Sequence, residues 1–248
     1  MFAAIPDYLS KCTETIDSTF SQLIPSSMKT LLLTSILGLT FYTATAQNTV
    51  EKFGDFSSAQ WTFEGKHTNA TYLGKPCIKL IRSKENALGA DIAYLTKYTF
   101  TDGRIDLDIA TPLPASTVSF LGILFRLNKV ASESRYECFY FRPFMSGKSG
   151  AMQYMPVNNG LINWPDYQAA VFQGSPVCKT HQWFHVSITV AGPMATVFVD
   201  GKQVYQIKNL ARGSSKGSVG IWLGNTPEGY FANFSVVRAV PPITKPMR

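Results

Sequence analysis

The chain has 248 residues, of which 45% are hydrophobic and 16% charged, and its 23 basic and 16 acidic side chains give a formal net charge of +7. The basic residues are scattered singly, which excludes the basic face that nucleic-acid-binding domains gather on one element. The positive balance still predicts a mild attraction to anionic polymers.

The first 46 residues read as a leader. From Met28 the chain runs MKTLLLTSILGLTFYTATAQ, with a lysine, an apolar run at 31–42 and small residues before Gln47. This pattern is typical of a secretory signal peptide, and the apolar run is shorter than the ~20 residues that span a bilayer. We therefore predict a signal peptide at 28–46, and a secreted or periplasmic protein without a membrane span in its mature chain. Residues 1–27 are interpreted as an upstream segment that a mis-called start codon would add.

Removing the leader leaves a mature chain of about 202 residues with 21 basic and 13 acidic side chains. That length corresponds to one domain, and a globule of this size buries about 70% of its unfolded surface without needing disulfides. We predict one domain at 47–239 and a short C-terminal tail at 240–248.

The cysteines and histidines show no metal-site spacing. We expect Cys138 to be a small buried side chain within a strand, and a disulfide between Cys77 and Cys178 is the one pairing to test. Because CxxC, HExxH and histidine clusters are absent, we predict no catalytic transition metal and no cofactor. A structural Ca²⁺ site could draw only on Asp55 and carbonyl groups near Asn233, and no aspartate-rich loop supports one.

Short segments of alternating polarity, separated by Gly, Pro, Asn and Asp, recur from Trp61 onward, and none has sustained helical periodicity. In chain order these predicted strands are Trp61–Glu64, Ala70–Leu73, Cys77–Arg82, Ala90–Leu95, Gly103–Ala110, Val118–Leu127, Arg135–Arg142, Ala151–Val157, Trp183–Ala191, Ala195–Asp200, Gln203–Lys208, Ser218–Leu223 and Gly229–Arg238. Asp200-Gly201 suits a type I′ hairpin turn, and Gly192-Pro193 marks a second hairpin. So many short strands predict an all-β sandwich.

Alternation assigns a core face and a polar, water-facing side to each strand. In YECFYFR, for example, Phe139 and Phe141 point to the core while Tyr140 and Arg142 point away. If this strand pairs with Val118–Leu127 as a hairpin, Gly122 lies beside Tyr140 and Phe120 beside Arg142. Gly122 would then leave open space on the polar side, as the floor of a groove does, although a glycine in a strand also marks bulges and tight packing.

Several segments resemble strands of the concanavalin A-like lectin and glucanase superfamily. QWFHVSITVAGPMATVFVDGKQV at 182–204 is similar to the penultimate hairpins of its laminin-G-like domains. FTDGRIDLDI at 100–109, GILFR…YECFYFRP at 122–143 and GYFANFSVVRA at 229–239 are similar to other strands of this superfamily, including its 3-keto-disaccharide hydrolase-like branch. The resemblance implies a jelly-roll β-sandwich of two antiparallel sheets that engages sugar on its concave face or rim. Its members range from lectins to glycosidases and lyases, so the fold does not decide the chemistry.

A carbohydrate-binding function makes the fewest demands on this sequence. Aromatic rings stack on the C–H faces of sugars, while Arg, Asn and Gln hydrogen-bond the hydroxyl groups. The stretch 136–160 and the loop NNGLINWPDYQ at 158–168 supply these types, on a long loop of the kind that carries specificity. We predict carbohydrate as the partner. The predicted contact residues are Arg126, Tyr140, Arg142, Gln153 and Trp164. An equally weighted alternative is that Trp164 only pins its loop to the sheet.

A glycoside hydrolase is the first alternative, and it needs two carboxylates. Asp106 and Asp108 share one strand face with Cα atoms about 6.5–7 Å apart, which suits such a pair. The family 16 signature Glu-x-Asp-x-x-Glu is, however, absent. The sequence therefore favours a structural role in which these aspartates pair with Arg104, Arg126 or Arg142.

Other functions have weaker support in the sequence. Glu137 shares its strand face with core residues, and we expect it to be structural. A lyase would need a base and a group that neutralises a sugar carboxylate. Tyr140, Arg142 and His185 supply these types if they share one face, but the alginate-lyase motif Gln-Ile-His is absent. A laminin-G-like protein-interaction module is the remaining class, in which the partner is a protein.

Overall fold

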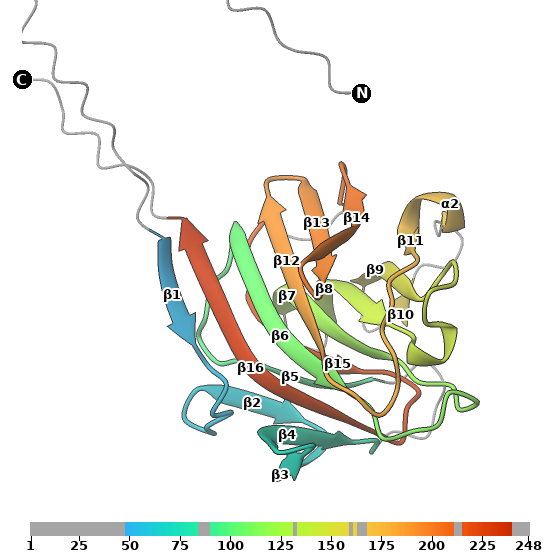
Figure 1. Ribbon diagram of the computed structural model, residues 1–248. Coiled ribbons are helices and arrows are strands. Elements are labelled where there is room, and N and C mark those ends of the chain that lie inside the picture. Colours follow the sequence, from blue (N-terminus) through green and yellow to red (C-terminus); the bar gives the residue numbers. More distant parts are fainter. Residues whose placement is uncertain are drawn as a thin grey trace, which may run out of the picture. The chain divides into compact units, whose positions relative to one another are not determined.

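The computed structural model describes residues 48–83, 90–130, 133–158, 161–162, 168–210 and 215–239, and these form two antiparallel sheets packed face to face (Figure 1). The predicted upstream segment, signal peptide and C-terminal tail lie outside the described residues.

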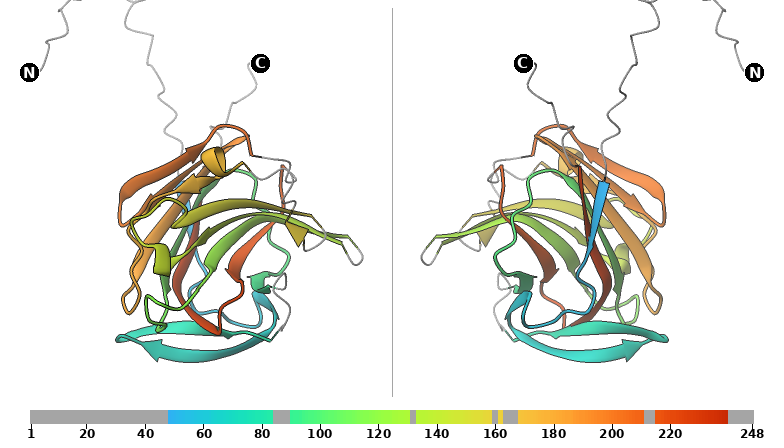
Figure 2. Two further views of the ribbon diagram at one scale, coloured as in Figure 1. Left: turned by 90° about the vertical axis from the view of Figure 1, so that its right-hand side faces the viewer. Right: turned by 90° about the vertical axis from the view of Figure 1, so that its left-hand side faces the viewer.

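Sheet I contains both the first and the last strand of the described chain, β1 (Asn48–Lys52) and β16 (Glu228–Ala239). Across the sheet its strands are β14 (Lys202–Ile207), β13 (Met194–Val199), β12 (Phe184–Ala191), β6 (Gly103–Ala110), β16, β4 (Lys75–Ile81) and β3 (Lys66–Tyr72), with β1 also paired to β16. β14 and β3 are therefore opposite edges of this sheet, and they lie at opposite ends of the sandwich (Figures 1 and 2).

Sheet II contains the strand that carries YECFYFR. Across the sheet its strands are β10 (Leu161–Ile162), β9 (Met152–Asn158), β8 (Glu133–Phe141), β7 (Leu121–Val130), β15 (Ser218–Leu223), β5 (Asp91–Leu95) and β2 (Trp61–Glu64), with β11 (Gln173–Gly174) also paired to β9. Two short helices, η2 (Pro143–Met145) and α2 (Ala169–Phe172), flank β9 in the chain. The fold class predicted from the sequence, an all-β sandwich of two antiparallel sheets, is confirmed.

The core lies between the two sheets and contains the side chains that alternation predicted to point inward. They are Ile105, Leu107 and Ile109 of β6, Leu121, Ile123 and Phe125 of β7, Phe139 and Phe141 of β8, and Phe184, Val186, Ile188 and Val190 of β12. The predicted hairpin of β13 and β14 is also present. Both residues of its turn have positive φ, 48° at Asp200 and 77° at Gly201, as a type I′ turn requires.

Alternation predicted that the outer face of sheet II is polar and faces water, and this prediction is wrong. Its outer face carries a second buried cluster made of Ile92, Leu124, Leu127, Tyr136, Cys138, Tyr140, Met155, Val157 and Trp222. The physical reason is that β7, β8 and β9 place apolar residues at both alternating positions, so each of these strands has two apolar faces. The outer face of sheet I, in contrast, carries the polar and charged side chains that alternation predicted.

The disulfide between Cys77 and Cys178 is not formed, because both residues are buried free thiols, as is Cys138. The Cys77 thiol lies 3.5 Å from the Ala70 carbonyl oxygen on the neighbouring strand β3. The Cys178 thiol faces a different carbonyl group, on the loop before β9. The core is large enough to hold the fold without a cross-link.

Candidate functional site

One lateral row of side chains crosses the outer face of sheet II. Trp222 of β15 lies opposite Gly122 of β7, Gly122 opposite Tyr140 of β8, Tyr140 opposite Gln153 of β9, and Gln153 opposite Gln173 of β11. Because directly opposite residues of an antiparallel pair project to the same face, strands far apart in the sequence bring these groups together.

Gly122 allows two aromatic rings to meet across the middle of this row. A Cβ atom at Gly122 would stand 2.5 Å from the Phe139 carbonyl oxygen and 2.9 Å from the Tyr140 Cβ. The Tyr140 and Trp222 rings close over the glycine with centroids 5.4 Å apart, and both are buried. The predicted pairing of Gly122 with Tyr140 is therefore confirmed, but aromatic rings fill the space that was predicted to be an open groove floor.

Two of the predicted contact residues hold each other in place. The Tyr140 hydroxyl donates a hydrogen bond to the Gln153 Oε1 atom, and both side chains are buried. This bond fixes the orientation of the Gln153 amide.

Arg142 follows β8 and carries the guanidinium group of the site. Its Cζ lies 5.0 Å from the centre of the Phe144 ring and 5.8 Å from that of Phe120, so the predicted proximity of Phe120 and Arg142 is confirmed. Its Nη1 donates a bond of 3.3 Å to the Gly150 carbonyl oxygen. Its Nε atom is buried and has no hydrogen-bond partner among the described residues. A donor in this state is unusual, because a buried N–H without an acceptor costs about 1–3 kcal/mol.

A turn and a neighbouring segment extend the site beyond Arg142. The Gly147 N–H donates to the Pro176 carbonyl oxygen at 2.8 Å, and the Cys178 N–H donates to the Ser146 hydroxyl at 2.9 Å. These bonds hold the turn 146–150 against the segment 173–178.

We call the resulting group the rim site. Its members share the outer face or the adjoining edge of sheet II, and they are Phe120, Tyr140, Arg142, Phe144, Gln153 and Gln173. The contact residues predicted from the sequence included Tyr140, Arg142 and Gln153. Phe120 was predicted only to lie beside Arg142, and Phe144 and Gln173 were missed. The second aromatic in FRPF was a usable signal for Phe144. No local signal marks Gln173, because its place depends on the pairing of β11 with β9.

Arg126 does not belong to the rim site. It lies at a bulge in β7 with a φ of 55°, and its side chain is only 6% exposed. Its Nη2 group donates to the carbonyl oxygens of Gly192 and Thr101 at 2.7 and 3.0 Å and contacts the Asp102 carboxylate at 3.1 Å. These bonds connect β7 to two loops of sheet I. The fifth predicted contact residue, Trp164, lies outside the described residues.

Asp106 and Asp108 lie on the outer face of sheet I. Asp108 accepts hydrogen bonds from His185 Nδ1 at 2.7 Å, Lys75 at 2.5 Å and Asn233 at 2.7 Å. Asp106 accepts bonds from Arg104 at 2.9 Å and from the Ser187 hydroxyl at 2.5 Å. Three arginines were predicted as partners of this pair of aspartates. Among the described residues, only Arg104 forms such an ion pair, with Asp106.

The network around Asp108 resembles a catalytic triad in its distances. His185 Nδ1 contacts Asp108, and its Nε2 lies 3.2 Å from the Ser187 hydroxyl oxygen. The hydrogen bonds to Asp106 and Asp108 raise the pKa of His185 to about 9. At neutral pH the imidazole is therefore protonated and cannot accept a proton from Ser187.

The two carboxyl groups also lack the property of a general acid. Burial raises the pKa of Asp108, but hydrogen bonds from His185, Lys75 and Asn233 outweigh burial and bring the pKa to about 2. Burial likewise raises the pKa of Asp106, and hydrogen bonds from its neighbours outweigh it, so that the net shift is downward. A glycosidase acid needs a raised pKa, which neither group has.

Two further predictions from the sequence concern the role of Glu137 and a lyase site. Glu137 is fully buried and accepts a hydrogen bond from the Tyr154 hydroxyl, in agreement with a structural role. The lyase arrangement of Tyr140, Arg142 and His185 is wrong, because His185 lies on the outer face of sheet I and the other two residues belong to sheet II.

The described residues contain no group of three or more His, Cys, Asp and Glu side chains that could hold a metal ion. Asp55 accepts a bond from the Ser57 N–H at 3.4 Å, and the Asn233 amide donates to Asp108 at 2.7 Å. Within the same residues, no helix has the length and apolarity needed to cross a membrane.

Comparisons with known proteins identify the fold. No protein-family model matches the chain, and a search of curated proteins finds no match. Among solved structures, the chain is similar to the carbohydrate-binding module CBM66 from Bacillus subtilis, with 13% identity, a TM-score of 0.52, and coverage of 71% of this chain and 95% of that chain. It is also similar to a protein of unknown function with a galectin-like fold from Bacillus subtilis, with 10% identity, a TM-score of 0.53, and coverage of 76% and 94%. The chain has the concanavalin A-like jelly-roll fold that the sequence resemblance implied.

Proposed function

We propose that this protein is a secreted or periplasmic carbohydrate-binding module that engages a saccharide at the rim site. The observation that carries the proposal is the half-buried guanidinium group of Arg142, which makes one long hydrogen bond to the Gly150 carbonyl oxygen and lies beside two half-buried aromatic rings. The carbohydrate-binding module CBM66 shares the fold, which makes the proposal consistent with the architecture but does not locate the site.

The chemistry of the rim site suits a sugar. A saccharide hydroxyl or ring oxygen would accept a hydrogen bond from the terminal N–H groups of the Arg142 guanidinium, which has five donors and makes one bond of 3.3 Å, from Nη1 to the Gly150 carbonyl oxygen. The Phe120 and Phe144 rings offer flat apolar surfaces to sugar C–H groups, and the half-buried amide of Gln173 offers both donors and an acceptor. Tyr140 contributes by holding the Gln153 amide rather than by stacking, since its own ring is buried under Trp222.

The outer face of sheet I is less suited to binding a neutral sugar. Its charged groups already satisfy one another in pairs, such as Lys75 with Asp108 and Arg104 with Asp106. A saccharide would have to displace these short bonds before it could form its own, which lowers the net gain in binding free energy.

The proposal predicts a specific loss of affinity on removal of the Arg142 guanidinium. In affinity electrophoresis against a panel of neutral and acidic polysaccharides, we expect Arg142→Ala to weaken retardation roughly tenfold, because a charge-assisted hydrogen bond contributes about 1.5–3 kcal/mol. Arg142→Lys should recover only part of the affinity, because an ammonium group cannot bond in the planar, two-donor manner of a guanidinium.

The matched control is Arg104→Ala, which removes a half-exposed guanidinium from the outer face of sheet I. We expect it to leave retardation unchanged, and thermal unfolding should show that all three variants remain folded. Equal affinities for wild type and Arg142→Ala, with both proteins folded, would contradict the proposed site.

The same preparation separates binding from cleavage. Reducing-end release measured by mass spectrometry on the panel would favour the hydrolase alternative, and the double variant Asp106→Asn, Asp108→Asn would then test whether the two aspartates carry it. Absence of both cleavage and retardation, together with capture of an envelope protein, would favour the laminin-G-like alternative.

A further inference from the structure

Three cations lie around the rim site, and one of them, Lys202, belongs to the edge strand β14 of sheet I. On the outer face of sheet I and at its edge the paired cations are Lys75 with Asp108, Lys79 with Glu228, Arg104 with Asp106, and Arg238 with Glu51. Around the rim site, Arg142, Lys148 and Lys202 have no carboxylate within ion-pair distance among the described residues. Cations without a carboxylate partner among the described residues therefore lie beside the proposed sugar site, and another such cation, Lys66, lies on β3.

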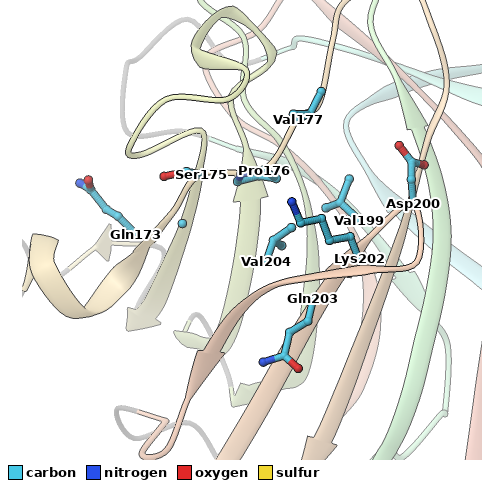
Figure 3. A pocket seen from close by; sticks show the side chains of 10 residues that line it. Gln173, Ser175, Pro176, Val177, Val199, Asp200, Lys202, Gln203 and Val204 are labelled. Atoms are coloured by element: carbon cyan, nitrogen blue, oxygen red, sulfur yellow. The ribbon is translucent and has the colours of Figure 1, made fainter. Parts of the chain in front are cut away.

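Lys202 lies in a pocket of about 590 Å³ between the segment 173–177 and the β13–β14 hairpin. Figure 3 shows its ammonium group extending from the hairpin towards Pro176 and Val177. The one acidic residue in the lining is Asp200, whose Oδ1 accepts the His185 N–H at 2.8 Å. The pocket thus contains one lysine and one aspartate, and the aspartate is bonded to the backbone at the hairpin turn.

The pocket adjoins the rim site through Gln173. This residue lines the pocket and also lies opposite Gln153 in the pairing of β11 with β9. Arg142 Nη1 and Gln173 Oε1 each lie 3.2 Å from the point where a Cβ on Gly150 would stand, so the two groups are neighbours. A chain of sugar units that contacts Arg142 can therefore continue past Gln173 towards Lys202.

We propose that the saccharide bound at the rim site is polyanionic, and that one of its carboxylate or sulfate groups binds Lys202 in this pocket. The inference rests on the proposed function, because it names the chemical class of the ligand at that site. An exposed ion pair contributes about 0.2–1 kcal/mol at moderate salt, so Lys202 tunes the choice of ligand while Arg142 supplies the main anchor. Selectivity for acidic polymers should weaken as added salt screens the charges.

The test uses polysaccharides that differ only in charge. The pairs are polygalacturonate with its fully methyl-esterified form, and κ-carrageenan with its desulfated form. In affinity electrophoresis at low salt, we expect the acidic member of at least one pair to retard the wild-type protein more strongly than its neutral partner does. Lys202→Gln should reduce affinity for that acidic member roughly two- to fivefold and leave affinity for the neutral partner unchanged.

Lys66→Gln is the matched control, because it removes the same charge from β3, at the opposite edge of sheet I from β14 (Figures 1 and 2). An equal loss of affinity in Lys66→Gln and Lys202→Gln would show that only net charge matters and would overturn the assignment to Lys202. Equal retardation by both members of every pair would overturn the polyanion but leave the proposed function intact. Retardation by neutral polysaccharides alone would also overturn the polyanion and leave the proposed function intact. Failure of every polymer to retard the protein would contradict both.

Discussion

Gly122 shows how one residue without a side chain shapes the outer face of sheet II. Its neighbours Tyr140 and Trp222 reach across it, and the resulting ring contact covers the strand. Because Tyr140 in turn holds the Gln153 amide, the glycine acts indirectly on the orientation of a proposed sugar contact.

Gly122→Ala is therefore expected to destabilise the protein. The added Cβ would stand closer to the Phe139 carbonyl oxygen and the Tyr140 Cβ than real contacts allow, and backbone cannot move aside cheaply. We expect a loss of about 1–3 kcal/mol, typical of overpacking, measured by urea denaturation at neutral pH. Unchanged stability, within about 0.5 kcal/mol, would mean that the strands shift freely and that the glycine has no packing role.

At the scale of elements, β6 and β12 are joined on their outer faces by a pH-sensitive group. His185 on β12 bonds to Asp106 and Asp108 on β6, and these bonds raise its pKa from 6.5 to about 9. A group whose pKa is higher in the folded state stabilises the fold fully below its unfolded pKa and loses that contribution as pH rises through the folded pKa. The contribution of His185 is thus complete below pH 6.5 and is lost as pH approaches and passes 9.

His185→Gln tests this linkage, because glutamine keeps a polar side chain but does not titrate. We expect the wild-type urea midpoint to exceed that of the variant near pH 6, and the difference to shrink steadily between pH 6.5 and 9. A difference between wild type and His185→Gln that stays constant from pH 6 to 10 would contradict the linkage.

Strands were largely predictable from the sequence because both sheets bury one face against the same core. All of the predicted strands appear, within a few residues at their ends. β1, β10 and β11 were missed. β10 and β11 have only two residues each, too few to show alternation. β1 reads NTVEK, which has one apolar residue, and it is held by its pairing with β16.

At the scale of the whole molecule, the sequence could not place residues on one sheet or the other. Asp108 and Arg142 both alternate with core residues, and alternation alone puts both on a polar face. In the structure they lie on opposite outer faces of the sandwich, since β6 belongs to sheet I and β8 to sheet II. The rim site also joins β8, β9 and β11, whose register depends on long-range pairing rather than on local pattern.

The two outer faces consequently have different properties. Sheet I presents a network in which charges neutralise one another, and sheet II presents an apolar face with an arginine and amide groups along one edge. We propose that the outer face of sheet II binds the ligand and that the charged pairs of sheet I are structural.

The measurement that tests this assignment most directly is a map of backbone amide shifts by NMR. Oligosaccharides cut from the polysaccharide that retards the protein most strongly would be titrated into the isotope-labelled protein. We expect shifts concentrated at Phe120, Tyr140, Arg142, Gln153 and Gln173, with the amides of β6 and β12 unmoved. Shifts concentrated around Asp106, Asp108 and His185 would contradict it and would place the ligand on sheet I.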